Sequence, residues 1–269
     1  MTDTDITTSN IIHWRGTDLG THTVAYTERD VIIYALAVGA AATELDLVFE
    51  ERLRVLPTFA LTLAQWAPDE LGSRGAFDTT TALHGSQQLT IFSPLPTSGE
   101  IAMKASVAEV WDKGTAAVFE VLVESKYFAA TWSIFAPGYG GYGGERGQSE
   151  RRTHFGEPEI VTELATSENQ AALCRLLGDR HHIHIVPEAA NRIGQPRPIM
   201  HGLCTLAAST LPLARERGAH PADLLELSAR FTAPAFPGQA LPIHGWRDGD
   251  TIGFTVGNAI SGGRARFSN

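Results

Sequence analysis

Hydrophobic and polar positions along the chain predict two long helices at corresponding places. Over residues 28–40, apolar side chains recur at the spacing of one helical face, and Thr27 with Asp30 fits a capping box at the start. The same spacing recurs over residues 201–217, where Gly218 supplies a stop signal. Each of these helices precedes a stretch of alternating residues.

Those two stretches match each other in turn chemistry. The first, "LTIFSPLPTSGEIAMKASVAEVWDKGTAAVFEVLVES", reads as strand, Pro/Gly turn, strand, "WDKG" turn and strand. The second, "LSARFTAPAFPGQALPIHGWRDGDTIGFTVGN", reads the same way with "WRDG" at its second turn. The matched positions, 135 to 140 residues apart, are Phe92 and Phe231, Pro94 and Pro234, Gly99 and Gly238, and Trp111 and Trp246. This repeat predicts an α+β protein of two similar halves, each an apolar helix followed by antiparallel strands.

A glycine-rich segment separates the halves. It reads "PGYGGYGGERGQSERR", from Pro137 to Arg152, and contains six glycines. A phosphate-binding loop would need the Lys-Ser/Thr ending of a P-loop or a strand-to-helix setting, and the segment has neither. We interpret it as a flexible crossing. The chain then divides into an N-terminal repeat (1–136), a linker (137–158) and a C-terminal repeat (159–269).

Composition narrows the class of protein. The 269 residues are 43% hydrophobic and 19% charged, which is typical of a globular protein, and the net charge of −9 argues against a nucleic-acid partner. No apolar run approaches the ~20 residues of a membrane span. The N-terminus has no signal-peptide pattern and the terminal "ARFSN" is not a peroxisomal tripeptide. We expect a soluble cytoplasmic protein with Cys174 and Cys204 as free buried thiols.

Candidate chemistry concentrates in "GDRHHIHIVPEAA", residues 178–190. In an extended segment His182 and His184 would share one face, with His181 on the other. Zinc needs a third protein ligand, and no nearby Cys or His-x-x-x-His pattern supplies one, so we expect no metal. The chain also lacks the Gly-x-Ser-x-Gly elbow of a serine hydrolase.

Acid–base chemistry is the remaining interpretation. Asp179 follows Gly178, which ends a short helix predicted from a capping box of Ser167 and Gln170. On a turn and an extended exit, Asp179 and His184 can converge on one water molecule and move its protons. The spacing alone leaves solvated surface residues as an equal alternative.

The segment "LLGDRHHIHIVPEAANRIGQPRPIMHGLCT" resembles the hydratase 2 motif of MaoC-like dehydratases, the (R)-specific enoyl-CoA hydratases. The family pattern runs Ser/Thr-Gly-Asp-x-Asn-Pro-Leu-His, then Asp-Pro, then a Pro-Ile-Leu-His-Gly-Leu-Cys helix start. The stretches "YTERDVIIYALAVGA", "LPTFAL", "LHGSQQLTIFSPLPTSGEI", "DKG" and "GYGGYGGERG" extend the resemblance over nearly the whole chain. It implies a tandem (double) hotdog fold, in which each repeat is a central helix wrapped by an antiparallel β-sheet.

The resemblance also implies an activity, the reversible hydration of a trans-2-enoyl-CoA to an (R)-3-hydroxyacyl-CoA by Asp179 and His184. The backbone N–H of Gly202, near a helix start, would bind the thioester carbonyl, where it stabilises the developing enolate. The acyl chain would enter the degenerate first repeat beside Glu50 and His84, for which a surface carboxylate and a packed histidine are equal alternatives. No cofactor is implied, and a homodimer is the family's expected state.

The sequence departs from the family pattern at three positions. His181 and His182 stand where the family has Asn-Pro, and Val186 replaces the Asp before Pro187. The His181 ring either takes over the hydrogen bond of the missing Asn near the catalytic water or crowds that water out. Two alternative functions follow: a dehydratase that acts on acyl carrier protein in fatty-acid elongation, and a catalytically impaired acyl-CoA-binding protein or structural partner in a dehydratase complex.

Overall fold

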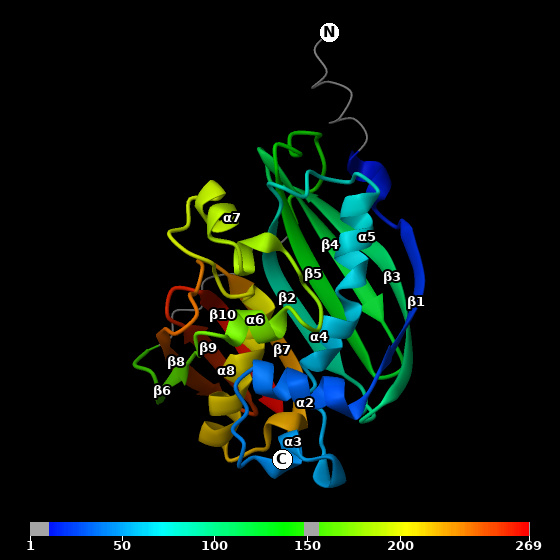
Figure 1. Ribbon diagram of the computed structural model, residues 1–269. Helices are drawn as coiled ribbons and strands as arrows, with labels where there is room; N and C mark the ends of the chain where they lie inside the picture. Colours follow the sequence, from blue (N-terminus) through cyan, green and yellow to red (C-terminus); the bar gives the residue numbers. More distant parts are fainter. Residues whose placement is uncertain (1–10, 148–155, 269) are drawn as a thin grey trace.

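Strands from both halves of the chain pair into one antiparallel sheet. The computed structural model describes residues 11–147 and 156–268 (Figure 1). Within them the strand order is β1-β3-β4-β5-β2-β7-β10-β9-β8-β6, and the halves meet where β2 pairs with β7. The strands are β1 (Asp18–Tyr26), β2 (Leu83–Ile91), β3 (Gly99–Asp112), β4 (Ala116–Glu124), β5 (Phe128–Pro137), β6 (Ile160–Ala165), β7 (Leu224–Phe231), β8 (Ala240–Asp248), β9 (Thr251–Val256) and β10 (Ile260–Phe267).

The strand order confirms the internal repeat. From each outer edge inward, the first half runs β1, β3, β4, β5, β2 and the second runs β6, β8, β9, β10, β7. Each strand therefore has a counterpart at the same place in the other half. The matched tryptophans lie on counterpart strands, Trp111 on β3 and Trp246 on β8. The expected α+β architecture of two sheet-and-helix halves is present.

The two predicted long helices form at the positions that their capping and stop residues indicate. In α2 (Glu28–Ala37), the Asp30 carboxylate accepts the backbone N–H of Thr27 at 2.8 Å, as a capping box requires. Helix α8 (Gly202–Arg217) ends at Gly218, whose φ of 74° is left-handed. The remaining helical segments are η1 (Ile11–Trp14), α3 (Leu45–Val48), η2 (Glu50–Arg52), α4 (Phe59–Ala64), α5 (Trp66–Ser73), α6 (Gln170–Cys174), η3 (His182–His184), α7 (Pro187–Arg192) and η4 (Pro221–Asp223).

Helix α6 is shorter than predicted. The Gln170 side chain accepts the backbone N–H of Ser167 at 3.1 Å, which is half of the expected capping box. The Ser167 hydroxyl instead donates to the Asn169 side chain at 2.9 Å, and Asn169 is the residue that precedes the helix. Regular α-helix then stops at Cys174, and hydrogen-bonded turns lead on to Gly178.

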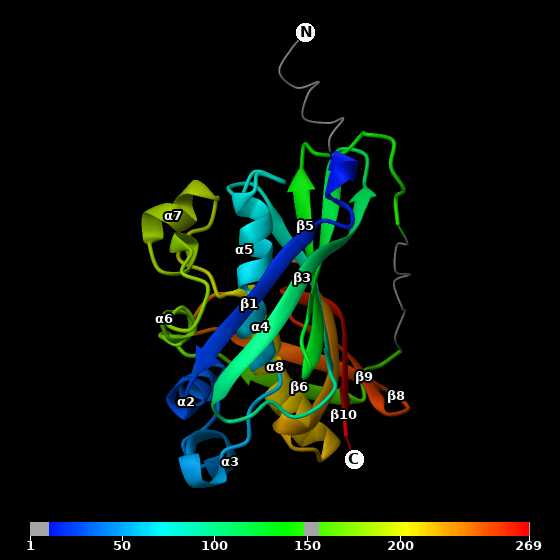
Figure 2. The same cartoon turned by 90° about the vertical axis from the view of Figure 1, so that its right-hand side faces the viewer.

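The helix against the sheet of the first half is α4–α5, rather than α2 as the sequence pattern indicated. Helix α4 packs on β5, and α5 packs on β1 and β4, whereas α2 packs on α6. Figure 1 shows α4–α5 along strands β3–β5, and Figure 2 shows α6 and α7 beyond α4–α5. Five of the six residues of α4 are buried, so its apolar run has no polar face to reveal a helical period. Its counterpart α8 is likewise buried continuously over residues 204–214.

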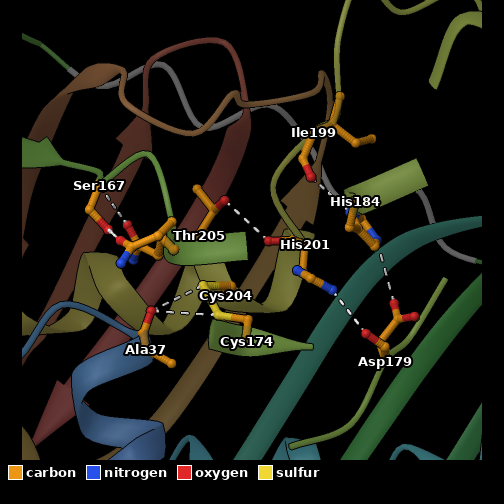
Figure 3. Close-up of a disulfide and its surroundings, with 11 residues drawn as sticks. Ala37, Ser167, Cys174, Asp179, His184, Ile199, His201, Cys204 and Thr205 are labelled. Carbon is orange, nitrogen blue, oxygen red and sulfur yellow. Dashed lines mark hydrogen bonds and ion pairs between the residues drawn. A yellow bond between two sulfur atoms is a disulfide. The ribbon is translucent and has the colours of Figure 1, made fainter. Parts of the chain in front are cut away.

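The cysteines form a disulfide, so the expectation of two free thiols was wrong. Cys174 on α6 and Cys204 on α8 are bonded, with Cα atoms 6.6 Å apart. Both sulfurs also lie within 3.6 Å of the carbonyl oxygen of Ala37, at the end of α2 (Figure 3). The two helical runs are 30 residues apart in sequence, and only the tertiary fold brings them together. Among the helices of the described residues, none has both the length and the hydropathy to cross a bilayer.

The described part of the glycine-rich segment is not a free crossing. Up to residue 147 it folds around the buried carboxylate of Asp112, at the end of β3. That carboxylate accepts three backbone N–H groups at 2.8 to 2.9 Å, from Gly114, Gly141 and Gly143. The glycines therefore let the main chain approach a buried anion closely. Residues 148–155 of the predicted linker lie outside the described residues.

We expect Asp112→Asn to destabilise the protein by about 1–3 kcal/mol, because an amide directs an N–H₂ group at backbone donors. The hydrogen bond from Gly141 has the largest effect on the pKa of Asp112 and lowers it. Burial acts in the opposite direction, but the other glycine N–H bonds help to keep the pKa below its ordinary value. A lowered pKa contributes stability that is present above pH ~4 and is lost as pH falls. Urea unfolding should therefore separate variant from wild type at pH 7 and bring them together in acid. Glu100→Gln, an exposed site on β3, is the control.

Candidate active site

A cavity of about 630 Å³ lies between the two halves. The first half contributes α4–α5, β2 and β5, and the second contributes the segment 178–184, the start of α8 and residues 231–235. Because β2 and β7 are neighbours in the sheet, the cavity lies beside the junction of the two repeats. Elements far apart in the sequence thus share one site.

The histidine run forms a 3₁₀ turn at the cavity rather than the extended segment assumed from the sequence. His184 is the last residue of η3 and is 6% exposed. Its Nε2 lies 3.5 Å from Oδ2 of Asp179, and its Nδ1 lies 2.8 Å from the carbonyl oxygen of Ile199 (Figure 3). The Ile199 carbonyl can only accept, so Nδ1 carries a proton and donates it. Nε2 is then the nitrogen that faces the carboxylate with its lone pair.

Asp179 is held as a carboxylate. Burial by itself would raise its pKa, but the hydrogen bond with His184 and the backbone N–H of His181 outweigh that effect and keep the pKa well below its ordinary value. The His181 N–H donates to Oδ1 at 2.8 Å. One carboxylate oxygen is therefore occupied by the backbone, and the other faces the imidazole of His184.

A third side chain, His201, belongs to this cluster, and the sequence analysis gave it no role. Its ring stacks on the His184 ring with centroids 3.7 Å apart and planes inclined by 25°. Its Nε2 lies 3.0 Å from the carbonyl oxygen of Asp179. Burial, followed by the nearby His184, lowers the pKa of His201 to about 4. The available signal was its place directly before Gly202 in the "MHGLCT" helix start.

His201 also supplies the third nearby ligand group that the sequence argument against a metal did not find. One ligand atom each from Asp179, His184 and His201 lie within 4.8 Å of one another. A histidine nitrogen binds a metal along a lone pair in its own ring plane. Two rings stacked as nearly parallel as these do not aim such lone pairs at a single ion, and the His201 Nε2–H is engaged by a carbonyl. The arrangement favours an acid–base cluster.

Gly202 and His181 both line the cavity. Gly202 is the first residue of α8, so its backbone N–H has no partner within the helix. A Cβ added there would lie 3.0 Å from the ring of Phe231. His181 caps the η3 turn, with Nδ1 accepting the backbone N–H of Ile183 at 3.4 Å.

The two acyl-site candidates of the first half have different positions. His84 on β2 lines the cavity, with its ring centroid 4.6 Å from that of Phe231 and its Nε2 3.1 Å from the carbonyl oxygen of Ser86. Burial lowers the pKa of His84 to about 4, so its ring is neutral near pH 7. Glu50 lies in η2, exposed and outside the cavity lining, so the structure does not bring it to the site.

Comparison with known proteins shows the family of this chain. Residues 24–136 match the family model described as the MFE-2 hydratase 2 N-terminal domain, and residues 151–264 match that of the MaoC-like domain. The chain belongs to the MaoC-like hydratase 2 family of dehydratases. Its fold is the double hotdog, and a Mycobacterium tuberculosis protein described with that fold aligns at a TM-score of 0.58 and 11% identity, a likeness of fold alone.

Individual relatives cover most of the chain. A 3-hydroxyacyl-thioester dehydratase Y of Mycobacterium tuberculosis is 34% identical over 239 residues, 82% of each protein. Mouse peroxisomal multifunctional enzyme type 2 is 34% identical over 266 residues, 92% of this chain but 36% of that enzyme, so the chain spans about a third of its length. The crystal structure of a MaoC-like dehydratase from Phytophthora capsici aligns with a TM-score of 0.86 and 25% identity, covering 97% of this chain and 98% of that one.

Proposed function

We propose that this protein is a hydro-lyase that reversibly hydrates trans-2-enoyl-CoA to (R)-3-hydroxyacyl-CoA. The observation that carries the proposal is the Asp179–His184 pair, 3.5 Å apart at a cavity shared by both repeats. The relatives named enoyl-CoA hydratase 2 and 3-hydroxyacyl-thioester dehydratase support the same reaction class.

In this mechanism the pair binds one water molecule between Oδ2 of Asp179 and Nε2 of His184. Water gives a proton to the pair while its hydroxyl bonds to C3 of the enoyl thioester. The pair then returns a proton to C2 on the same face, so water adds across the double bond and both side chains regain their starting states. Each assisted proton transfer contributes ~10²–10⁴-fold to the rate.

Gly202 is the proposed donor to the thioester oxygen. Addition at C3 moves negative charge onto that oxygen as an enolate, and a backbone N–H at a helix start stabilises such charge. The absence of a side chain lets the Phe231 ring lie against this position, where a Cβ would be 3.0 Å away. The donor therefore lies in the first turn of α8, against the ring of Phe231.

The acyl chain is proposed to enter the first repeat, residues 1–136, while the C-terminal repeat, residues 159–269, carries the catalytic groups. The part of the cavity formed by the first half includes the apolar side chains of Leu61, Phe77, Trp132 and Ile134. The neutral ring of His84 borders the same space and fits an uncharged chain. Glu50 has no place in this proposal.

The reaction is tested by hydration of crotonyl-CoA and longer enoyl-CoAs, followed by loss of enoyl absorbance and chiral analysis of the product. We expect turnover, the (R) product and no loss of activity on exhaustive chelation. Parallel assays with the same acyl group on acyl carrier protein identify the carrier. Tight acyl-CoA binding without hydration would instead identify an impaired binding protein. We also propose a homodimer, which the family resemblance implies, and a cytoplasmic location, which the sequence composition indicates. Sedimentation and localisation experiments test these two proposals.

His181→Asn is expected to keep or raise the catalytic rate. An Asn oxygen can accept the Ile183 N–H that Nδ1 of His181 accepts now, and it restores the amide of the family pattern. Steady-state kinetics with crotonyl-CoA measure the effect. A folded variant with strongly reduced turnover would count against both roles considered for this ring.

A further inference from the structure

We propose that His201 is a positioning residue of the hydration site, which fixes Asp179 and His184 relative to each other and to the backbone N–H of Gly202. The inference rests on the proposed hydratase function. It assigns His201 no proton transfer and no contact with the reacting atoms. Its role is to set the geometry of the groups that do make such contacts.

Three connections converge on His201, as Figure 3 shows in part. Its ring covers the face of the His184 ring at 3.7 Å, and its Nε2 donates to the carbonyl oxygen of Asp179 at 3.0 Å. The peptide bond joins it to Gly202, the proposed donor to the thioester oxygen. One residue thus links the imidazole, the carboxylate segment and the oxyanion donor.

The backbone of His201 is itself fixed. Its carbonyl oxygen accepts the backbone N–H of Thr205 at 3.0 Å and the Thr205 hydroxyl at 3.2 Å, both from the first turn of α8. These two bonds anchor the residue to the first turn of the helix. A ring held this way can prevent the His184 ring from tilting out of line with Asp179.

A packing role alone does not explain why this residue is a histidine. His201 is 6% exposed, and its Nδ1 is buried with no hydrogen-bond partner among the described residues. Burying an unpaired nitrogen costs free energy that an apolar ring of the same shape would not incur. What the histidine adds over phenylalanine is the bond from Nε2 to the carbonyl of Asp179. The free-energy cost of the unpaired Nδ1 thus accompanies a hydrogen bond to Asp179, the residue of the proposed catalytic carboxylate.

The ring remains uncharged in the working range of the site. Burial and then His184 lower its pKa to about 4, while Asp179 acts in the opposite direction. The titratable groups that face it are Asp179 and His184 from the segment 178–184 and Arg175 just after α6. A neutral His201 donates at Nε2 without competing for the proton that the catalytic pair moves.

Three substitutions separate the two contacts. His201→Phe keeps an aromatic face for stacking and removes the donor, His201→Gln keeps a donor near the Nε2 position and removes the ring, and His201→Ala removes both. We expect the Phe and Gln variants to lose about tenfold in kcat and the Ala variant about tenfold more, with KM changed less than about threefold. His220→Gln, a half-buried histidine at η4 outside the cavity lining, should keep wild-type kcat.

Two readouts distinguish positioning from general stabilisation. In an Asp179→Asn background, His201→Ala should cost little further activity, because it acts through that carboxylate. In the otherwise unchanged enzyme, the looser Asp179–His184 contact should raise the pKa of Asp179, so the acid limb of kcat/KM should move to higher pH. Additive losses, an unmoved acid limb, or a folded Ala variant with kcat within about threefold of wild type would overturn the proposal.

The ring ¹⁵N signals of His184 give a test that needs no turnover. In both proteins they should report a proton on Nδ1, which the Ile199 carbonyl holds, but in His201→Ala the Nε2 signal should broaden because the ring can tilt relative to Asp179. Unchanged signals would reject the positioning role even if hydration occurs. A wild type that hydrates no enoyl thioester would reject the proposed function, while the NMR result still decides the role of His201. If the Ala variant does not fold, the Phe and Gln variants carry both measurements.

Discussion

Asp179→Asn is expected to lower kcat for enoyl-CoA hydration by about 10²-fold or more, with the protein still folded. The amide keeps the shape of the side chain and an oxygen for the backbone N–H of His181, which donates at 2.8 Å. It cannot hold or return a proton, and it removes the negative charge that faces His184. His184→Ala should have an effect of similar size, because it removes the other half of the pair.

These losses should appear in single-turnover rates as well as in kcat, since they concern the chemical step. Circular dichroism and the unfolding midpoint verify that each variant is folded. Glu188→Gln, an exposed carboxylate in the first turn of α7, is the matched control and should turn over at the wild-type rate. Near-wild-type turnover in either Asp179→Asn or His184→Ala would reject the mechanism proposed here.

Reducing the Cys174–Cys204 disulfide is expected to destabilise the protein by about 3–4 kcal/mol, the effect of closing a loop of this length in the unfolded chain. The bond joins residues 30 apart and ties α6 to the first turn of α8. Thermal unfolding with and without reductant should show a midpoint lower by roughly 5–10 °C in the reduced protein.

Cys174→Ser supplies the control, because it should have the lower midpoint without reductant and should not respond to it. An unreduced wild type with two titratable thiols and no response to reductant would contradict the disulfide. The redox state of this pair also tests the proposed cytoplasmic location, since that compartment keeps most thiols reduced. Thiol trapping in freshly lysed cells shows which redox state the protein has there.

Local signals account for the parts of the fold that were predicted correctly. Thr27 and Asp30 start α2, and Gly218 ends α8, through bonds and torsion angles within a few residues. The turn chemistry of the two matched blocks likewise depends on neighbouring residues. The same dependence on local signals explains why α4 was missed. Its core-facing and neighbour-facing sides are both apolar, so the sequence shows no helical period there.

The sequence prediction of the site rests on one short motif, and it has no signal for contacts that only the fold assembles. Asp179 and His184 lie five positions apart, and the η3 turn brings them together. His201 reaches them only through the placement of α8 against that turn, a contact that spacing cannot show. Glu50 was assigned from its position near a motif of the first half, and it lies in η2 outside the cavity lining.

Because β2 pairs antiparallel with β7, each half of the chain packs against the other as one subunit of a dimer packs against its partner. Ser86 pairs with Arg230 and Leu89 with Leu227 at the centre of a sheet whose strand order is the same from either edge. Two identical copies of one repeat could meet through the same twofold arrangement, but every substitution would then occur twice. Fusion of the copies ends that constraint. One half can lose its water-activating groups and widen for the substrate's tail while the other keeps its chemistry, an asymmetry that a symmetric pair of chains cannot evolve.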